Sequence, residues 1–268
     1  MNLFKAIKRR RSIRNYGEKE LSETQLDEVE KIINESRELF SGVSADVHLV
    51  RNGRALQENI SGIIADYGKV EAPHYLVVTA ESTKKGYVEV GYRYEFTILA
   101  LAARGLGTCW IGKGFRDEEL SSYVPLPSGQ TCITLIAFGP LSSGDDLYEI
   151  EDPKRKELSH FLVNRDPDGL DGATTEIIDC VRRSPSSLNS QPWRLVLEEG
   201  VIHLYLRTRN KITRMVIKDM DKMNWVDAGI GLCHLEIGGR KFRDQVEVEE
   251  VAHPDKNGLS YVGSLVEG

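Results

Sequence analysis

The chain has 268 residues, of which 40% are hydrophobic and 28% charged, and its 35 basic and 41 acidic residues give a net charge of −6. At roughly 150 residues per domain, this length predicts one large domain or two small ones. The composition excludes collagen-like, coiled-coil and disordered proteins, and the acidic balance argues against a general nucleic-acid binder. No apolar run approaches the ~20 residues of a membrane span, and no signal-peptide core follows the basic N-terminus. We therefore expect a cytoplasmic protein that binds neither nucleic acid nor membrane.

The cysteines and histidines show no ligand spacing. Cys109, Cys132, Cys180 and Cys233 are far apart and form no CxxC pair, so we expect buried reduced thiols rather than a zinc or redox motif. The six histidines contain no HxH or HExxH pattern. The sequence therefore predicts no metal site.

The N-terminal segment MNLFKAIKRRRSIRNY carries six basic residues and no acid. A short transit peptide, a solvated basic face and an anion site are all compatible with this composition. Within RRSIR, Arg10 and Arg14 are four residues apart and would share a helix face, with the Ser12 hydroxyl and N–H group between them. Two guanidinium groups and a backbone N–H group suit a phosphate.

The first half continues with alternating helices and strands. Ser22 and Gln25 form a capping-box pattern that begins a helix, and Gly105 is placed to end a later one in a left-handed conformation. The expected elements are a strand at 46–50, helical character at 54–67, a strand at 74–80, a long apolar helix at 87–104, a strand at 133–139 and a connector at 142–169.

The second half repeats this order. Thr174 or Thr175 would cap a helix that ends before Pro185, because proline disfavours helical geometry in the preceding residue. Strands at 194–199 and 201–207, an apolar helix at 225–239 and strands at 245–252 and 261–266 are expected to follow. The order helix, strand, strand, helix, strand thus occurs twice, and the two long helices begin similarly, with VEVG and WVDAG. We interpret this as a structural repeat.

Two segments could carry chemistry. SPSSLNSQPW, at 184–193, places five small polar side chains between two prolines and could present hydroxyls, an amide and N–H groups to a flavin ring edge; it could equally be a helix-ending loop before an anchoring tryptophan. A serine nucleophile is disfavoured, because GxSxG and SxxK are absent. GLGTCWIG, at 105–112, follows a helix and lacks the GxGxxG spacing, so it is not a dinucleotide fingerprint. Its glycines would let the backbone approach a ligand.

With KRKEL at 154–158, these segments resemble motifs of the FMN-dependent nitroreductase family. RRSIR is similar to its phosphate motif, SPSSLNSQPW to its second flavin segment, GLGTCWIG to its backbone contact at the reactive flavin edge, and KRKEL to its closing basic motif. The resemblance implies an α+β fold, three-layer α/β/α with mostly antiparallel sheets.

The motif order departs from the family. In ordinary members the proline–serine segment follows RRSxR after about 25 residues and completes the flavin site of a second subunit. Here that position reads ESRELFSGVS, and the segment occurs some 170 residues later. The resemblance therefore implies two fused halves, 1–160 and 161–268, that imitate a homodimer with one complete FMN site and one lost. We expect a monomer or weak homo-oligomer, with Trp193 and helices 87–104 and 225–239 at the internal interface.

The resemblance also assigns roles to individual residues. FMN phosphate is close to a dianion and attracts several cations. Arg10 and Arg155 would bind the phosphate with help from Arg11, Ser12 and Lys156, and Arg14 and Lys69 would lie at the pyrimidine edge of the flavin. The flavin ring and the ribityl chain would be contacted by Pro185, Ser186, Ser187 and Asn189. The backbone of Ile111 and Gly112 would face the reactive nitrogen. No catalytic side chain is required, since the flavin carries the chemistry.

The predicted function is hydride transfer from NADH or NADPH through FMN to a small acceptor such as a nitroaromatic or a quinone. A non-catalytic flavin- or ligand-binding protein is the alternative, because loss of one site shows that this lineage tolerates decay. A basic-tailed nucleic-acid binder would instead show salt-sensitive binding to DNA.

Overall fold

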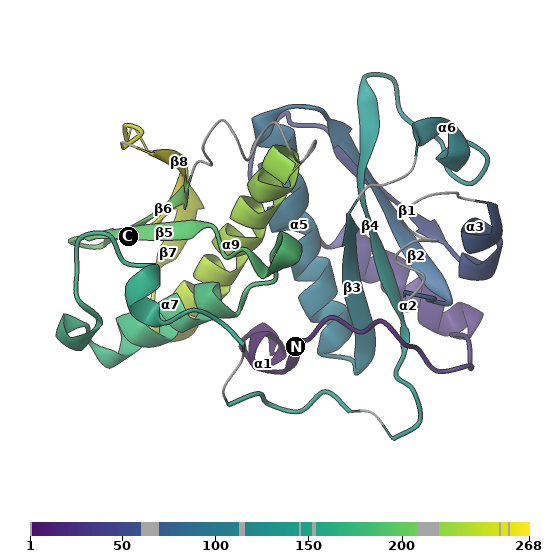
Figure 1. Cartoon of the computed structure of the whole chain (residues 1–268), viewed down its shortest axis with the longest axis horizontal. Helices are drawn as coiled ribbons and strands as arrows, with labels where there is room; N and C mark the ends of the chain where they lie inside the picture. The colour runs from purple at the N-terminus through teal and green to yellow at the C-terminus, as the bar shows by residue number, and fades with distance from the viewer. Residues whose placement is uncertain are drawn as a thin grey trace. The chain divides into compact units, whose positions relative to one another are not determined.

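The computed structural model describes residues 2–59, 70–112, 116–144, 146–151, 154–207, 220–251, 253–256 and 258–268 (Figure 1). Contacts between Cα atoms divide the chain into two compact units. Unit 1 is Met1–Arg37, Ser41–Gly86 and Phe96–Glu149, and unit 2 is Glu38–Phe40, Tyr87–Glu95 and Ile150–Gly268. The expected halves 1–160 and 161–268 remain a prediction.

Unit 1 is built on a four-stranded antiparallel sheet with the strand order β1-β2-β4-β3. Its apolar core includes Tyr75, Val77 and Leu135 of the sheet together with Leu56 and Leu120 from two short helices. The elements in chain order are α1 (Leu3–Arg9), α2 (Glu23–Asn34), β1 (Ala45–Val50), α3 (Gly53–Asn59), β2 (His74–Glu81), α5 (Lys84–Ala102), β3 (Leu106–Gly112), α6 (Asp117–Leu120) and β4 (Gln130–Pro140).

Unit 2 contains the second four-stranded antiparallel sheet, with the order β5-β6-β8-β7. The long helix α9 packs on this sheet, and α7 packs against α9. The elements are η1 (Leu158–His160), η2 (Pro167–Gly169), α7 (Gly172–Arg183), η3 (Ser187–Asn189), β5 (Trp193–Glu198), β6 (Val201–Arg207), α9 (Met220–Phe242), β7 (Val246–Glu249) and β8 (Leu259–Glu267).

The two sheets are the same arrangement built twice. Their strand orders correspond one to one, and each has a register irregularity in the corresponding strand pair. In β2·β4 it falls between Val78 and Thr79, and in β6·β8 between Leu204 and Tyr205. The expected α+β class with antiparallel sheets is confirmed. The expected repeat was one strand short in the first half, because GLGTCWIG forms strand β3 rather than a glycine loop.

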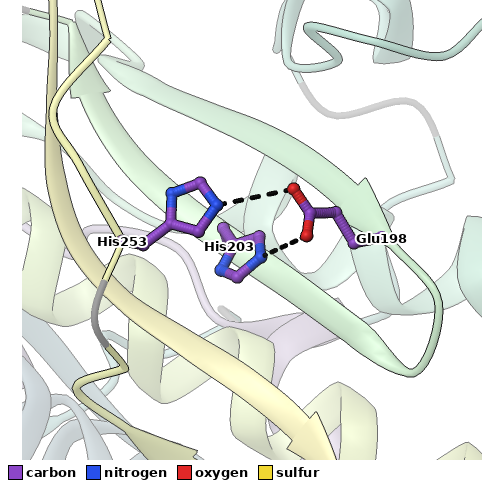
Figure 2. Close-up of side chains that lie close together, drawn as sticks. All are labelled: Glu198, His203 and His253. Carbon is purple, nitrogen blue, oxygen red and sulfur yellow. Dashed lines mark hydrogen bonds and ion pairs between the residues drawn. The ribbon is translucent and has the colours of Figure 1, made fainter.

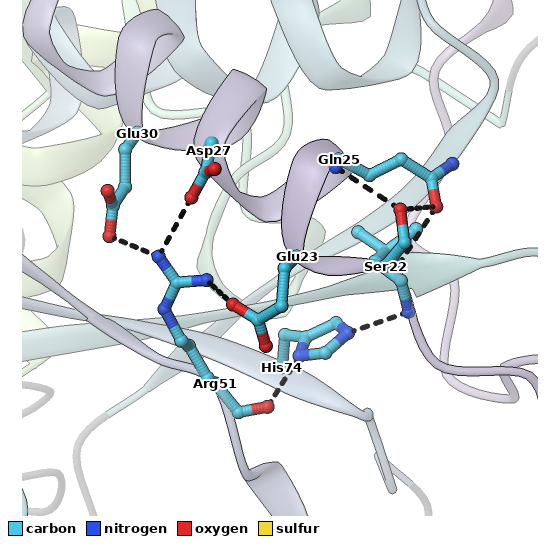
Figure 3. A network of polar contacts seen from close by, with 8 residues as sticks. Ser22, Glu23, Gln25, Asp27, Glu30, Arg51 and His74 are labelled. Atoms are coloured by element: carbon cyan, nitrogen blue, oxygen red, sulfur yellow. Dashed lines mark hydrogen bonds and ion pairs between the residues drawn. The ribbon is translucent and has the colours of Figure 1, made fainter.

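Helix α2 begins where its sequence predicts. Ser22 and Gln25 form the reciprocal capping box, and the nearby Leu21 N–H group donates to His74 Nε2 at 3.2 Å. Arg51, after β1, pairs with three acids of this helix, Glu23, Asp27 and Glu30 (Figure 3). Since these partners are largely exposed, solvent screens the ion pairs and each adds little to the stability of the helix.

Two expectations about helices were wrong. Helix α1 ends at Arg9, and Arg10 has extended geometry with ψ 130°, so Arg10 and Arg14 do not share a helix face. The cap of α7 is Asp171, whose side chain accepts from the Thr174 N–H group at 2.8 Å, and neither Thr174 nor Thr175 caps it. The helical stretch expected at 54–67 begins as α3, and its residues beyond 59 lie outside the described part of the chain.

Within unit 2, the first turns of α5 cross α9 with backbone against backbone. A Cβ atom at Gly91 would overlap the carbonyl oxygen of Val226, and a Cβ atom at Gly229 would overlap that of Val88. The contact is reciprocal. Val226, whose carbonyl faces Gly91, lies three residues before Gly229, and Val88, whose carbonyl faces Gly229, lies three residues before Gly91. These are the glycines of VEVG and VDAG, so the similar sequences at the starts of these two helices reflect the helix contact that they share.

In the described part of the chain, no helix has the length and apolar character needed to cross a bilayer. All four cysteines lie in this part, are buried, and take no part in a disulfide.

Candidate functional site

In unit 1, RRSIR runs beside the start of edge strand β3. Ser12 forms a parallel bridge with Thr108, and the Ile13 N–H group donates to the Thr108 carbonyl at 2.9 Å. Gly107 makes this approach possible, because a Cβ atom there would lie 3.0 Å from Ile13 Cβ. One glycine of GLGTCWIG therefore serves packing of the basic segment.

The basic side chains surround the next residue of this strand. Burial raises the pKa of the Cys109 thiol, and Arg14, Arg10 and a hydrogen bond with Ser12 offset part of this rise. Arg10 is 6% exposed, whereas Arg14 lies at the surface. The structure thus brings Arg10, Ser12 and Arg14 together near Cys109.

Arg11 has a different environment. Its Nη2 donates to the Asp146 carbonyl at 2.6 Å, and its guanidinium lies 4.5 Å from the centre of the Tyr148 ring. Both partners precede the KRKEL segment by fewer than ten residues. Arg11 therefore ties the basic segment to the connector that leads into unit 2.

The far end of β3 has one open edge. The Thr108 carbonyl points away from β4 toward residue 13, and backbone groups along an antiparallel strand alternate between its two edges. Gly112 consequently faces the open edge, and nothing lies within 4 Å of a Cβ atom built on it. Ile111 faces β4, and its carbonyl accepts from Thr134 Oγ1 at 2.7 Å. Of the two predicted backbone contacts, Gly112 has the geometry to meet a ligand.

In unit 2, SPSSLNSQPW contains the backbone strain of the described chain. Leu188, Asn189 and Gln191 have φ values of 52°, 53° and 51°, and no other non-glycine residue among those described has positive φ. Such conformations cost about 1–2 kcal/mol each and cluster at functional sites. Leu188 is also 70% exposed. A plain helix-ending loop has no need of three strained residues.

Side chains hold this loop in its conformation. The Asp227 carboxylate accepts from the Ser187 N–H group at 3.0 Å, and the Asp227 carbonyl accepts from Trp193 Nε1 at 2.7 Å. Ser186 Oγ accepts from the Gln191 N–H group at 3.0 Å. Trp193 is fully buried and packs on Gly231 of α9. Several hydrogen bonds and the packing of Trp193 therefore hold the loop in its strained conformation, as a pre-organised binding loop requires.

The KRKEL segment lies against the same loop. Arg155 Nη1 donates to Asn189 Oδ1 at 3.0 Å, the Lys156 N–H group donates to Gln191 Oε1 at 2.8 Å, and Lys156 Nζ donates to the Ser190 carbonyl at 3.0 Å. The two motifs are 30 residues apart in sequence, and unit 2 joins them.

Positive charge accumulates beside this contact. Burial and the neighbouring Arg207 lower the pKa of Arg194 to about 10. Burial, Arg194 and Arg207 lower the pKa of Lys156, and burial, Arg194, Lys156 and Arg207 lower the pKa of His160 to about 4. Cations that depress one another's pKa values form a site that an anion would stabilise.

The predicted site residues therefore fall into two groups. Arg10, Arg11, Ser12, Arg14, Ile111 and Gly112 belong to unit 1, and Arg155, Lys156, Pro185, Ser186, Ser187 and Asn189 belong to unit 2. Lys69 lies outside the described residues. Sequence reasoning missed Asp227 and Gln191, which hold the strained loop. For Asp227 there was a signal, since an acid within an apolar helix pattern needs a polar partner.

Comparison with known proteins identifies the family. A family model described as "Putative TM nitroreductase" matches residues 2–239, and the chain belongs to this family. A crystal structure of a putative nitroreductase from Thermotoga maritima has a TM-score of 0.67 and 21% identity, and the match covers 100% of this chain and 94% of that one. This match confirms the nitroreductase fold. No protein with a curated description matches the chain.

Smaller solved nitroreductases match part of the chain. One from Bacteroides fragilis with bound FMN is 19% identical, with a TM-score of 0.47, and covers 57% of this chain and 96% of its own. One from Desulfitobacterium hafniense with bound FMN is 19% identical, with a TM-score of 0.46, and covers 59% of this chain and 98% of its own.

Proposed function

We propose that this nitroreductase-family chain is a flavoenzyme that binds one FMN and transfers hydride from NADH or NADPH to a small acceptor such as a nitroaromatic or a quinone. The strained, side-chain-braced loop at 184–193 carries the proposal. Its sequence resembles the family's ring-side flavin segment, and its three positive φ values are unexplained by packing alone.

The residues present suit FMN. Arg10 and Ser12 would bind phosphate, assisted by Arg11, and Arg155 and Lys156 of the cationic cluster would contribute from unit 2. Arg14 and Lys69 would stabilise negative charge at the pyrimidine edge. The loop residues Pro185, Ser186, Ser187 and Asn189 would contact ring and ribityl, and backbone at Ile111 and Gly112 would face the reactive nitrogen. Bound FMN supplies the hydride chemistry, and these residues bind and orient it.

One chain supplies both groups of residues in this proposal, so the functional unit is a single-chain pseudo-dimer with one flavin. We expect about one FMN per chain at any protein concentration, because RRSIR and PSSLN each occur once in the sequence. Two flavins per chain would overturn the single-site proposal, and stoichiometric FAD would overturn the choice of FMN.

Arginine variants test the site directly. Arg10→Ala should weaken FMN binding by about 2–3 kcal/mol, on the scale of a hydrogen bond to a charged group. Arg14→Ala should in addition lower the flavin midpoint potential, because reduced flavin carries extra negative charge. Lys5→Ala, an exposed cation of helix α1, is the matched control and should leave affinity and potential unchanged. Wild-type values in both arginine variants would refute the assignment of RRSIR to the flavin.

Stopped-flow mixing of holoprotein with NADH or NADPH separates the enzyme from a non-catalytic flavin-binding protein. Flavin bleaching within seconds, followed by reoxidation on adding a quinone or a nitroaromatic, is the outcome expected of the enzyme. A flavin that stays oxidised for hours with both donors would establish the binding protein instead.

A further inference from the structure

Three ligand-type side chains meet on the face of the unit 2 sheet that lies opposite α9. Glu198 ends strand β5, His203 lies on β6, and His253 belongs to the connection between β7 and β8 (Figure 2). The Glu198 carboxylate oxygens lie 3.5 Å from His203 Nε2 and 3.4 Å from His253 Nε2. One ligand atom from each residue lies within 4.8 Å of the other two.

These distances match a metal coordination sphere. Zinc binds imidazole nitrogen and carboxylate oxygen at about 2.0–2.2 Å, so neighbouring ligand atoms of a tetrahedral site are about 3.4 Å apart. The two nitrogen-to-oxygen separations, one to each oxygen of the Glu198 carboxylate, are close to this value. Two imidazoles and a carboxylate are also the ligand set of known three-ligand zinc sites.

Hydrogen bonds at the opposite ring nitrogens fix the direction of both Nε2 atoms. His203 Nδ1 is 2.7 Å from Ser264 Oγ, and His253 Nδ1 contacts the Tyr205 hydroxyl. Metal-binding histidines typically engage their second nitrogen in this way, which holds ring orientation and tautomer.

The hydrogen bond between His253 Nδ1 and the Tyr205 hydroxyl sets the tautomer of His253 through its direction. When Nδ1 carries the ring proton, the Tyr205 hydroxyl donates to the Pro254 carbonyl at 3.2 Å. The Nε2 lone pair then faces Glu198 Oε1 at 3.4 Å, and this is the tautomer that binds a metal ion.

His203 is suited to the same role. It is 3% exposed, and its Nε2 faces the Glu198 carboxylate at 3.5 Å. The two imidazole rings are neighbours, with centroids 4.0 Å apart and planes tilted by 33° to each other.

The corresponding positions of unit 1 show that the fold does not need polar residues here. Counting from the register irregularity of each sheet, Glu198 corresponds to Val50 and His203 to Val77. Both valines are buried in an apolar cluster. Two of the three polar residues in unit 2 therefore stand where unit 1 has buried valines, which indicates a specific role.

We propose that Glu198, His203 and His253 form a binding site for a divalent transition-metal ion of the zinc class. Glu198 has 52% of its side chain exposed, which gives the ion a path from solvent. The ion would fasten the β7–β8 connection, through His253, onto strands β5 and β6. Since the site lies within unit 2 and uses none of the proposed flavin residues, it is independent of the proposed function.

The test is zinc binding by the full chain, prepared without a histidine tag and stripped with EDTA. Calorimetric titration with ZnCl₂ should give one ion per chain, and a rise in melting temperature should accompany binding. Glu198→Gln and His253→Gln remove ligands with little change of size and should each weaken zinc binding at least about 100-fold. Tyr205→Phe, which removes only the brace of His253, should weaken it about 10-fold.

His48→Gln is the matched control, since His48 is a strand histidine of the other sheet, and it should bind zinc like wild type. Cobalt titration of the wild type gives an independent spectroscopic readout that needs no variant. Absence of zinc binding by the wild type would overturn the proposal and leave a proton between His253 and Glu198. Unchanged affinity in both ligand variants would overturn it as well. FMN content should not change on EDTA treatment, so failure here and failure of the proposed function are distinguishable.

Discussion

The two sheets of this chain share their strand order and the position of their register irregularity. The sheet face that carries Val77 in unit 1 and the matching face that carries His203 in unit 2 nevertheless differ in polarity. In unit 1 that face is apolar, with Val50, Val77 and Leu135 in one buried cluster. In unit 2 the residues at the same register positions are Glu198, His203 and Ser264. Backbone pairing is therefore enough to specify the sheet. The side chains on one face can be apolar or polar, provided that each buried polar group has a hydrogen-bond partner.

The loop after α2 and the loop after α7 differ in the same way. Glu89 of α5 accepts from the Phe40 N–H group at 2.9 Å, and Asp227 of α9 accepts from the Ser187 N–H group at 3.0 Å. Both acids lie two residues before the crossing glycine of their helix. Only the second loop has strained non-glycine residues. The anchoring acid therefore belongs to the scaffold, and the strain belongs to the loop that we assign to the flavin.

The largest expected effect concerns the crossing that both helices share. Gly229→Ala places a Cβ atom on the Val88 carbonyl oxygen, and no rotamer change relieves a clash with backbone. We expect a loss of at least about 3 kcal/mol in the free energy of unfolding, at the upper end of overpacking costs, measured by urea denaturation. Gly172→Ala is the control, because nothing lies within 4 Å of its Cβ position. Equal stability of both variants would show that the helices do not meet at these glycines.

Exchanging single residues between the two outer faces should have unequal costs. Val77→His buries an imidazole without a partner in an apolar cluster, and we expect a loss of about 3 kcal/mol. His203→Val, measured in EDTA, should cost only about 1 kcal/mol, because Ser264 Oγ keeps Tyr261 as a partner at 2.7 Å. Thermal and urea unfolding give both values. Equal costs would contradict the contrast between the faces.

The anchoring acids should be equivalent for stability and different for function. Asp227→Ala removes the acceptor of the Ser187 N–H group, and Glu89→Ala removes the acceptor of the Leu39 and Phe40 N–H groups. Each variant should cost about 2 kcal/mol. Only Asp227→Ala should also weaken FMN binding, since it releases the strained loop. Flavin titration and urea unfolding of the same two variants provide the measurements, and loss of FMN affinity in Glu89→Ala would argue against our assignment of the loop.

The sequence predicted most elements because their signals are local. The capping box of Ser22, the positive φ of Gly105 and the two long apolar helices depend on nearby residues. Strand β3 was missed because glycines in GLGTCWIG weaken strand propensity, although its pairing with β4 compensates in the structure. Arg10 and Arg14 were placed on one helix because their spacing allows it, yet the chain becomes extended at Arg10 to pair with β3.

Contacts set by sheet register could not be predicted from spacing. His203 and His253 are 50 residues apart, and Glu198 reaches His203 only because β5 and β6 pair as they do. One signal was present: His203 is a polar residue inside the mainly apolar strand VIHLYLR. The family motifs, in contrast, could be identified without any structure, because each is a contiguous segment.

A smaller effect separates the two loops themselves. Leu188→Gly removes strain of about 1–2 kcal/mol at φ 52° and adds about 0.5–1 kcal/mol of unfolded-state entropy, so a net gain of roughly 0.5 kcal/mol is expected. Leu39→Gly in the corresponding loop has no positive φ to relieve and should destabilise. Urea midpoints of the two variants should therefore shift in opposite directions, and a shift in the same direction would mean that strain at Leu188 is compensated by its side chain.

The smallest effect arises where the two sheets carry opposite charge. By register, Arg194 and Arg207 correspond to Asp46 and Glu81 of unit 1. Burial, together with Arg194, Lys156 and Arg207, lowers the pKa of His160 to about 4. The unfolded chain then binds a proton at this histidine near pH 6.5 while the folded chain does not. The contribution of His160 to stability is therefore complete above that pH and declines as the pH falls toward about 4.

Proton NMR titration, with His160→Gln to assign the ring signal, measures this pKa directly. Arg194→Ala should raise it, because a neighbouring cation is lost. Inorganic phosphate should raise it in the wild type, because an anion among Lys156, Arg194 and Arg207 favours the charged imidazole. The phosphate titration decides whether these cations form an anion site. An unchanged His160 pKa at saturating phosphate would mean that the cations of unit 2 do not bind an anion together. The charge difference between the two sheets would then have no role in anion binding.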